Sequence, residues 1–468
     1  MGRRDGTPSG WLPAAAAVAV AAWGANQFTA LASVYRARTD WSALSLAAMF
    51  SVYLVGLVPG LLLAGPVAAR CGRRRTVRAA LALSAAASAL LAVPEESTVF
   101  AARLATGFAA GLVFVAGAAW LRELAGPEAP PEVSARRAMY ATATGFAAGA
   151  LASGVVAEWL PGPTVLPALA HALGCLLVLR ATRRLPDTAP ARTAPGHGVA
   201  TGPAAASGHG AAPGHGAAAV RHPRFRYVVL PASPAVLGAA TVGYAVLPPL
   251  VAHHLPGYAP LFSGLVAALT LATGALAQPF AARLDDARSA RATLAAMATV
   301  IAGLLLGALA ADRDSVGLVL AAAVVLGTGY GLTLGAGLHE VERLARRHEA
   351  EQQGEPQGEQ QGEELAERRT EQQAARPAAV RRPGPGPAPL YQSTTSSGFL
   401  TPLLLAGTAG RASYPALLVG MAGVGVLGLA VTAAHSRRHL PEPPAPGKGE
   451  DSSVPTGPTP RSRPPWAE

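Results

Sequence analysis

The chain has 468 residues, of which 51% are hydrophobic and 14% charged, with a formal net charge of +11 and a mean hydropathy of +0.31. These values lie outside the range of ordinary soluble domains and indicate a membrane protein. The positive charge does not indicate a nucleic-acid binder, because the basic residues lie between apolar runs rather than with aromatic residues on one soluble face. Cys71 and Cys175 are too few for a disulfide scaffold, so we expect free thiols.

Twelve apolar runs are long enough to cross a membrane as helices. A hydrocarbon core about 30 Å thick needs roughly 20 apolar residues of helix, so a run of this length bounded by charge or by Pro and Gly clusters predicts a span. The first six predicted spans are residues 12–35, 44–67, 76–94, 99–121, 138–159 and 164–179. The second six are residues 227–251, 261–282, 292–311, 316–338, 390–409 and 414–434. The sequence therefore predicts an all-α membrane protein with twelve transmembrane helices in two six-helix bundles.

Polar segments separate the predicted bundles into two domains. We expect the N-terminal bundle at residues 1–184 and the C-terminal bundle at 226–438. The linker at 185–225 is rich in Gly, Ala, Pro and His and has too little apolar surface to fold, so we expect it to be flexible. A Gln, Gly and Glu repeat at about 345–388 predicts an insertion into the second bundle, and the Pro-rich tail at 439–468 is predicted to be disordered.

The linker contains three Gly-His-Gly triplets, and a further histidine lies near its end. These side chains could gather a metal ion, but drift in a low-complexity linker gives the same pattern. We expect no metal and no other cofactor. The four histidines are His197, His209, His215 and His222.

The distribution of Lys and Arg predicts the orientation of the spans. Nearly all basic residues fall on the side that holds the linker, the insertion and both termini. The exceptions in the loops on the other side are Arg36, Arg38, Arg313 and Arg411. Because positively charged segments stay in the cytoplasm, we expect a multi-pass protein of the plasma (inner) membrane with both termini cytoplasmic.

The two halves show a weak internal repeat. PVAAR at 66–70 ends the second span, and PFAAR at 279–283 ends the eighth. GLVFVAGAAWLRELA, which begins at Gly111, resembles GLTLGAGLHEVERLA, which begins at Gly331. Both matches pair a span with the one six later, as expected of transporters built from two related bundles.

A dense arginine cluster lies between the second and third spans. It reads G-x-x-x-x-R-x-G-R-R and contains Gly65, Arg70, Gly72, Arg73 and Arg74. The glycines permit a tight turn and close helix approach. The guanidinium groups can bind carboxylates or helix-end carbonyls of the other bundle in one state and release them in another, which would make this a gating loop. Alternatively, the arginines only fix the topology and contact lipid phosphates.

This loop resembles the signature loop of the major facilitator superfamily. In the fourth span, Arg103 with Gly107 and Gly111 is similar to the R-x-x-x-G motif of that family, and the first two spans resemble uncharacterised actinobacterial-type members. The resemblance implies a monomer in the lipid bilayer that moves a small-molecule substrate by alternating access, without nucleic acid. One departure is Ala69, where the family usually has an acidic residue that helps to lock the outward-open state. It implies a lock that is weaker or differently built.

Five polar residues within the spans are candidates for the substrate or proton pathway. An arginine at the centre of a lipid-facing helix costs about 2.5–3.5 kcal/mol on insertion scales, so Arg103 either faces a central cavity or extends to the outer interface. Asn26 and Gln27 either line the same cavity or form hydrogen bonds between helices. Tyr244 and Gln392 are further candidates for this cavity.

Glycines in the fifth span give the only indication of direction. Gly145, Gly149 and Gly154 resemble an incomplete form of the glycine-rich motif of antiporter members of the family. Small residues at such spacing also pack helices closely in any membrane bundle. The resemblance favours export over import.

Titratable and nucleotide-binding groups limit the mechanism. No predicted span holds Asp or Glu near its middle, and Glu158 and His171 are the candidates for proton coupling. The chain has no G-x-x-x-x-G-K-[ST] loop for ATP and no paired-carboxylate or metal motif of a membrane enzyme. We predict an efflux transporter of a drug or metabolite and not an enzyme, with coupling to protons left open. The alternatives are an uptake carrier or uniporter, and a non-transporting membrane receptor or scaffold.

Overall fold

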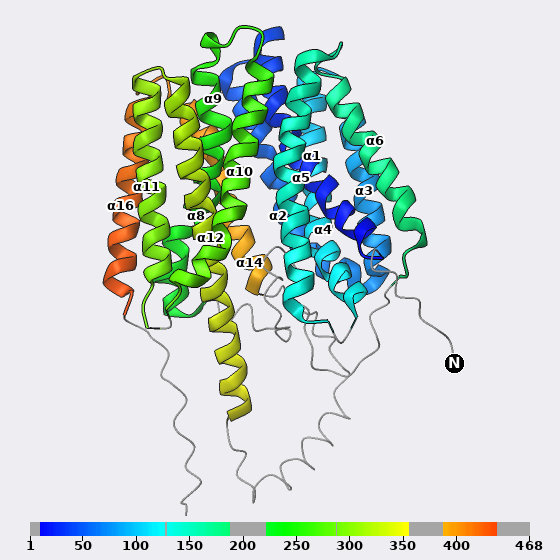
Figure 1. Ribbon diagram of the computed structural model, residues 1–468, viewed down its shortest axis with the longest axis vertical. Coiled ribbons are helices and arrows are strands. Elements are labelled where there is room, and N and C mark those ends of the chain that lie inside the picture. The colour runs from blue at the N-terminus through cyan, green and yellow to red at the C-terminus, as the bar shows by residue number, and fades with distance from the viewer. Residues whose placement is uncertain (1–9, 127–128, 188–220, 287, 355–386, 438–468) are drawn as a thin grey trace, which may run out of the picture.

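In the described part of the chain, the regular secondary structure is helical apart from one isolated β-bridge between Asp286 and Ser289. The computed structural model describes residues 10–126, 129–187, 221–286, 288–354 and 387–437 (Figure 1). Most of the predicted linker, the predicted insertion beyond residue 354 and the predicted tail lie outside the described residues.

Six helices form the first half, one for each predicted span. They are α1 (Leu12–Arg38), α2 (Ala43–Cys71), α3 (Arg73–Leu91), α4 (Glu96–Ala125), α5 (Pro131–Trp159) and α6 (Leu166–Ala181). Gly72 separates α2 from α3 and has φ +88°, a backbone conformation that glycine adopts without a steric penalty. The tight turn expected at this glycine is therefore present.

The second half also has six membrane-length stretches, two of which are irregular. Its first stretch is one continuous helix made of η3 (Phe225–Val229), α8 (Leu230–Thr241), η4 (Val242–Val246) and α9 (Leu247–Leu250). The remaining regular helices are α10 (Ala259–Leu284), α11 (Arg291–Asp312), α12 (Val316–Gly354) and α16 (Tyr414–His435). The eleventh stretch of the chain is α14 (Pro387–Thr395), η6 (Ser396–Leu400) and α15 (Thr401–Thr408).

Prolines account for the irregular stretches, because a proline has no N–H for the normal helical hydrogen bond. The two π-helical segments η3 and η4 are followed by Pro231 and Pro248, respectively. In the eleventh stretch Pro402 cannot donate to the carbonyl of Gly398, which instead accepts the N–H of Thr401 and the hydroxyl of Thr241. The 3-10 segment η6 therefore breaks this helix at mid-length.

The helix α12 continues well beyond the predicted span, which ends at residue 338, and enters the region predicted as an insertion. Its extension is rich in Glu, Arg, Ala and Gln, which are strong helix formers, and it reaches Gly354. Figure 1 shows the end of α12 protruding below the other helices.

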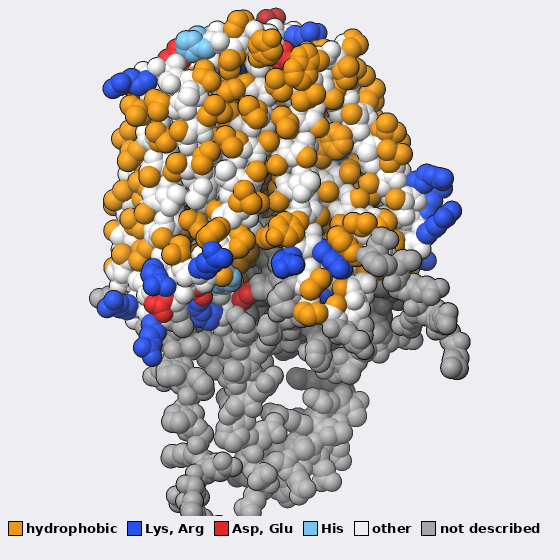
Figure 2. All heavy atoms as spheres, in the orientation of Figure 1, with side chains coloured by type: hydrophobic (Ala, Val, Ile, Leu, Met, Phe, Trp, Pro, Cys, Tyr) orange, Lys and Arg blue, Asp and Glu red, His pale blue; other side chains and the backbone are white. Residues whose placement is uncertain are grey.

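Ten of the described helical stretches are long and apolar enough to cross a membrane. The two exceptions are α3, which begins with several arginines, and the interrupted eleventh stretch. On the face drawn in Figure 2, apolar side chains cover the middle of the molecule, and charged side chains gather toward its two ends. Exposed leucines such as Leu173 and Leu177 on α6 are part of this outer surface, as expected of side chains that face lipid.

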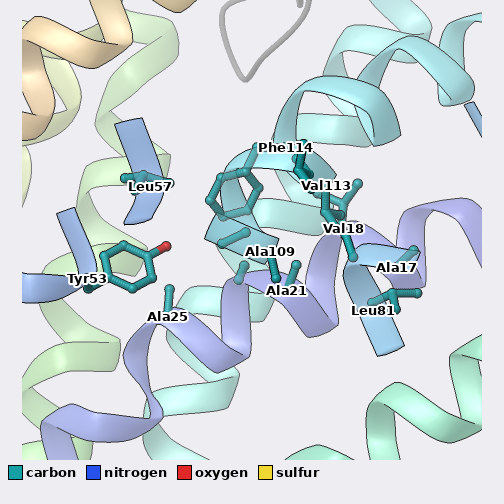
Figure 3. Close-up of a cluster of buried hydrophobic side chains, with 14 of the residues drawn as sticks. Ala17, Val18, Ala21, Ala25, Tyr53, Leu57, Leu81, Ala109, Val113 and Phe114 are labelled. Carbon is teal, nitrogen blue, oxygen red and sulfur yellow. The ribbon is translucent and has the colours of Figure 1, made fainter. Parts of the chain in front are cut away.

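Small side chains form the core of the first half. In Figure 3, Ala21 of α1 lies beside Ala109 of α4, and Val18 of α1 lies beside Val113 of α4. Helices in lipid are held by close van der Waals contact rather than by exclusion of water, so alanine and glycine at these contacts bring the backbones together.

The predicted packing glycines lie at close contacts between helices. Gly107 and Gly111 of α4 face the backbone of α2, and a Cβ at Gly111 would lie 2.6 Å from the carbonyl oxygen of Leu57. Gly145 and Gly149 of α5 face the backbone of α1. Gly65 is different: it lies inside α2, and a Cβ added there would have no other atom within 4 Å, so the close approach expected at this glycine is absent.

Candidate functional site

The molecule has two ends, which we call the terminal face and the far face. The terminal face is the end at which α1 begins and α16 ends, and it carries Arg70 and the loop that follows it (Figure 1). The far face carries the loops between α1 and α2 and between α11 and α12. The terminal face corresponds to the predicted cytoplasmic side.

A cavity lies between the two halves on the terminal side of the middle. The first half contributes side chains of α2, α4 and α5, including Tyr53 and Phe114. The second half contributes α8, α10, α12, α14 and η6, including Tyr330 and Gln392. We call it the terminal-side cavity.

A second cavity lies nearer the far face. It is lined by Phe28 and Phe50 of the first half and by Tyr244 and Tyr414 of the second half. We call it the far-side cavity. Both cavities are therefore built by both halves of the chain, as a pathway across the molecule requires.

An aromatic barrier of four side chains, Phe50, Tyr53, Tyr244 and Phe399, separates the two cavities. The ring of Phe50 lies 6.0 Å from that of Tyr244 and 5.7 Å from that of Phe399, measured between centroids. The rings of Tyr53 and Phe399 lie 5.3 Å apart. These distances are in the range of favourable aromatic contact, so the barrier also joins the two halves.

The interruption of the eleventh stretch positions the barrier. Phe399 lies in η6, and its carbonyl oxygen accepts a hydrogen bond of 2.9 Å from the hydroxyl of Ser51 in α2. This bond crosses from one half to the other within the buried interior. Phe399 and Ser51 are residues that sequence reasoning missed, and the polar first half of the predicted eleventh span was the one signal for an unusual segment there.

The two halves also meet closely at the far face, where α5 packs on α10. A Cβ at Gly154 of α5 would lie 2.7 Å from the carbonyl oxygen of Pro260, and one at Gly264 of α10 would lie 2.7 Å from that of Ala150. The carboxylate of Glu158 accepts a 3.4 Å hydrogen bond from the N–H of Leu261. Of the three glycines predicted in the fifth span, Gly154 is thus the one at the contact between the halves.

The guanidinium group of Arg103 is buried inside the first half and lines neither cavity. It donates hydrogen bonds to the carbonyl oxygens of Ala25, Met49 and Phe50, at 3.2, 3.3 and 3.4 Å respectively. Its charge lies over three aromatic rings, those of Phe28, Phe50 and Tyr53.

This arrangement matches neither of the two interpretations that the sequence left open for Arg103. With 1% of its surface exposed, the side chain does not extend to an interface. It instead joins α1, α2 and α4 directly behind Phe50 and Tyr53, two rings of the aromatic barrier.

Gln27 belongs to a buried polar network within the first half rather than to a cavity lining. Its amide donates to the hydroxyl of Ser88 at 3.0 Å, and Ser88 Oγ lies 2.6 Å from Nδ1 of His171. The other ring nitrogen of His171 lies 2.9 Å from the carbonyl oxygen of Val20. Asn26 is also buried and lines neither cavity. For Gln27 the structure thus has the hydrogen bond between helices that was the alternative prediction.

The arginine loop after α2 binds within its own half in this conformation. Arg73 is buried and forms an ion pair of 3.1 Å with Glu123 of α4. Arg74 donates to the carbonyl oxygen of Arg183 at 2.6 Å, whereas Arg70 is exposed and has no ion-pair partner among the described residues. The bonds to the other bundle that this loop was expected to make are therefore absent from the described part of this conformation.

The second half has a counterpart of this ion pair with the charges reversed. The weak repeat aligns Glu123 of α4 with Arg343 of α12, and Arg343 binds Asp285 in the loop after α10. In the same region Arg224 binds Glu340 through two hydrogen bonds, and both side chains are buried. Sequence reasoning found the repeat but did not extract these pairs from it.

The two remaining pathway candidates each line one of the two cavities. Tyr244 belongs to the aromatic barrier and lines the far-side cavity. Gln392 lines the terminal-side cavity, and its side-chain oxygen is buried without a hydrogen-bond partner among the described residues. The structure thus brings these two residues to the interface between the halves.

Two histidines and one carboxylate gather on the far face. The Nε2 atoms of His253 and His254 lie 2.8 and 2.9 Å from Oδ2 of Asp314. Although desolvation acts in the opposite direction, the hydrogen bonds and charges of the two histidines hold the pKa of Asp314 below its usual value. The cluster connects the loop after α9 to the loop between α11 and α12, and both loops belong to the second half.

Comparison with known proteins gives one family and one fold. The sequence model of the Major Facilitator Superfamily matches residues 14–353. The crystal structure of a point mutant of the nucleoside transporter NupG has a TM-score of 0.62 and 13% identity, over 91% of this chain and 98% of that one. A second crystal structure of NupG has a TM-score of 0.59 with the same identity and coverage. No curated protein sequence matches the chain.

Proposed function

The chain belongs to the major facilitator superfamily and is a secondary transporter, and we propose that it moves a small molecule through the two cavities by alternating access. The observation that carries this proposal is the aromatic barrier, which is built by both halves and lies between a cavity on each side. The two halves contact each other at this barrier and, nearer the far face, where α5 packs on α10. With the terminal face in the cytoplasm of a plasma-membrane protein, the conformation is inward-facing.

We propose export as the direction of transport. The support is the incomplete antiporter-like glycine motif in α5, whose Gly154 lies where the halves meet. A second candidate is transport of a nucleoside, which is favoured by the similarity of the fold to a nucleoside transporter.

We propose that transport is coupled to protons and that Glu158 carries the proton. Its carboxylate accepts an N–H from the first turn of α10, where a helix N-terminus favours negative charge. Protonation would remove this charge and weaken the contact that holds the far face closed. Each transport cycle would then be linked to one titration at the far face.

The test is flux in proteoliposomes that contain the purified full chain. Loading them with a metabolite extract and measuring each solute that leaves should reveal saturable export of at least one compound, increased by a proton gradient. Phe399→Ala should open a path between the cavities and give a faster, poorly saturable leak of the same compound. Phe280→Ala, which removes an exposed ring of α10, is the matched control. The proposal would be contradicted if no solute left these proteoliposomes faster than it leaves protein-free liposomes.

A further inference from the structure

We propose that the terminal-side cavity takes an uncharged aromatic molecule that donates a hydrogen bond to the side-chain oxygen of Gln392. This inference rests on the proposed transport function and adds the chemical class of the substrate. It is carried by the charge of the lining, by its rings and by one unpartnered atom.

No charged side chain lines the terminal-side cavity among the described residues. The buried cation behind it, Arg103, is already bonded to three carbonyl oxygens and covered by three rings. A charged ligand would therefore lose its hydration without gaining a counter-charge, and burial of an unpaired ion is far more costly than burial of a neutral polar group. The cavity selects against both anions and cations.

Aromatic rings supply much of the lining. Phe114 and Phe146 of the first half face each other edge to face, with centroids 5.8 Å apart. Tyr330 and Tyr391 of the second half also line the cavity. Rings prefer offset-stacked or edge-to-face partners, so a ligand with a flat aromatic group gains contacts with both halves at once.

Most hydroxyl groups of the lining are already bonded within the protein. Thr142 donates to the carbonyl oxygen of Ala138 at 2.9 Å, and Tyr391 donates to that of Thr333 at 3.3 Å. Thr395 likewise donates to the backbone oxygen of Gln392. These groups are satisfied without a ligand.

The side-chain oxygen of Gln392 is different, because it is buried and has no partner in the part of the chain that the structure describes. A buried acceptor without a donor is unfavourable, and an N–H or O–H of a bound molecule would remove that cost. A site of this kind discriminates strongly against an analogue that lacks the donor, because the protein group is then left unpaired.

The experiment is a binding screen on the full chain in nanodiscs. The library contains neutral, cationic and anionic aromatic compounds in equal numbers. It includes one matched set with the same indole ring system: neutral tryptophol, cationic tryptamine and anionic indole-3-acetate. Bound ligands are detected by thermal stabilisation and quantified by titration. Neutral compounds should dominate the ligands found, and each should bind at least about tenfold more tightly than its charged analogues.

Two substitutions test the role of Gln392. Gln392→Leu should weaken binding of donor-bearing ligands about tenfold and leave their N- and O-methylated analogues unaffected. Gln392→Glu should shift preference toward the cationic member of each matched set. Gln278→Leu, which removes the other amide of the same cavity, should preserve the ratio between donor-bearing and methylated ligands.

The outcomes separate this inference from the proposed function. Charged compounds that bind as tightly as neutral ones, an absence of any neutral aromatic ligand, or equal losses for methylated and unmethylated ligands in Gln392→Leu would each overturn the inference. Neutral ligands that bind but show no flux in proteoliposomes would uphold the inference and contradict transport. Flux of charged solutes alone would uphold transport and contradict the inference.

Discussion

Arg103 is a buried cation whose compensation comes from carbonyl dipoles and aromatic faces. Placing an arginine inside a membrane helix is costly, and the three carbonyl bonds and three rings offset that cost. Two of those rings, Phe50 and Tyr53, belong to the aromatic barrier. The side chain therefore supports both the fold of the first half and the position of the barrier.

Arg103→Ala should lower both flux and stability. The free energy of unfolding should fall by about 2–4 kcal/mol, because three buried carbonyl oxygens lose a charged donor and a cavity replaces the side chain. Arg103→Lys should restore part of both, since an ammonium cannot reproduce the planar donor set. Thermal unfolding in detergent and flux in proteoliposomes measure the two effects.

Arg38→Ala, at the exposed end of α1, is the control for Arg103. It should leave both quantities near those of the unmodified chain. If Arg103→Ala kept normal flux and normal stability, the proposal that this guanidinium group supports the first half and the barrier would be wrong.

Arg73 and Arg75 differ in burial although they are near neighbours. Arg73 pairs with Glu123 at 3.1 Å with 9% of its side chain exposed, whereas Arg75 lies 3.6 Å from Asp187 with 79% exposed. Arg73→Ala should therefore reduce flux at least about tenfold, because it removes an ion pair between two helices that is largely shielded from water, and Arg75→Ala should change flux little. Flux at equal protein abundance is the measurement, and equal small effects would indicate that both arginines only anchor the topology.

At the scale of elements, the contact between α5 and α10 closes the far face. Gly154→Leu should prevent that contact, because even a Cβ there would lie 2.7 Å from the carbonyl oxygen of Pro260. The variant should favour a conformation open at the far face and lose most of its flux. Gly420→Leu is the matched control, since nothing lies within 4 Å of a Cβ at that glycine of α16.

Accessibility of an introduced cysteine measures the opening expected of Gly154→Leu. A cysteine at Ser263, which lines the far-side cavity, should react faster with a membrane-impermeant maleimide in Gly154→Leu than in Gly420→Leu. Equal rates would contradict a gate at this contact.

The loop cluster of Asp314 should give a pH-dependent contribution to stability. Its pKa is lower in the folded state than in the unfolded chain, so the contribution is present above the unfolded value of about 3.9 and is lost as pH falls through the folded-state pKa. The melting temperature of Asp314→Asn should lie slightly below that of the unmodified chain at pH 6, and the two should converge near pH 3. Asp312→Asn, on a side chain with 65% exposure, should follow the unmodified chain throughout.

The charge-reversed ion pairs of α4 and α12 reflect the same element-scale organisation. Glu123 and Arg343 occupy aligned positions of the weak repeat; Glu123 binds Arg73 at the start of α3, and Arg343 binds Asp285 in the loop before α11. A pair works equally well with either polarity, so the two halves can diverge in sequence here while they keep an ion pair at the aligned position.

For the whole molecule, the native cysteines test the orientation. Cys71 is exposed at the terminal face and Cys175 is buried. An impermeant maleimide should label Cys71 only from the cytoplasmic side, in inside-out vesicles, and Cys175 should remain unlabelled in both orientations.

A cysteine on the opposite face completes the orientation test. Asp312→Cys in a Cys71→Ser background should be labelled only in intact cells, because Asp312 lies at the far-face end of α11. Labelling of Cys71 from outside intact cells would reverse the orientation and, with it, the proposed inward-facing state.

The sequence by itself predicted the number, order and approximate bounds of the membrane-length stretches. Hydrophobic length is a local property, and charged or Gly and Pro-rich boundaries end each run, so no knowledge of neighbours is needed. The arginine loop and the motif around Arg103 also indicated the family correctly. The end of α12 was missed, because helix propensity extends that helix into a polar segment that hydropathy assigns to a loop.

Only the tertiary structure decided what the polar side chains contact. Gln27 and Arg103 are both intramembrane polar residues in the sequence, yet one bonds Ser88 of α3 and the other the carbonyls of α1 and α2. The barrier depends on Ser51 and Phe399, which are 348 positions apart. The rotation of each helix about its axis, and the identity of its neighbours, are set by packing between distant segments, so a linear pattern of apolar runs does not contain them.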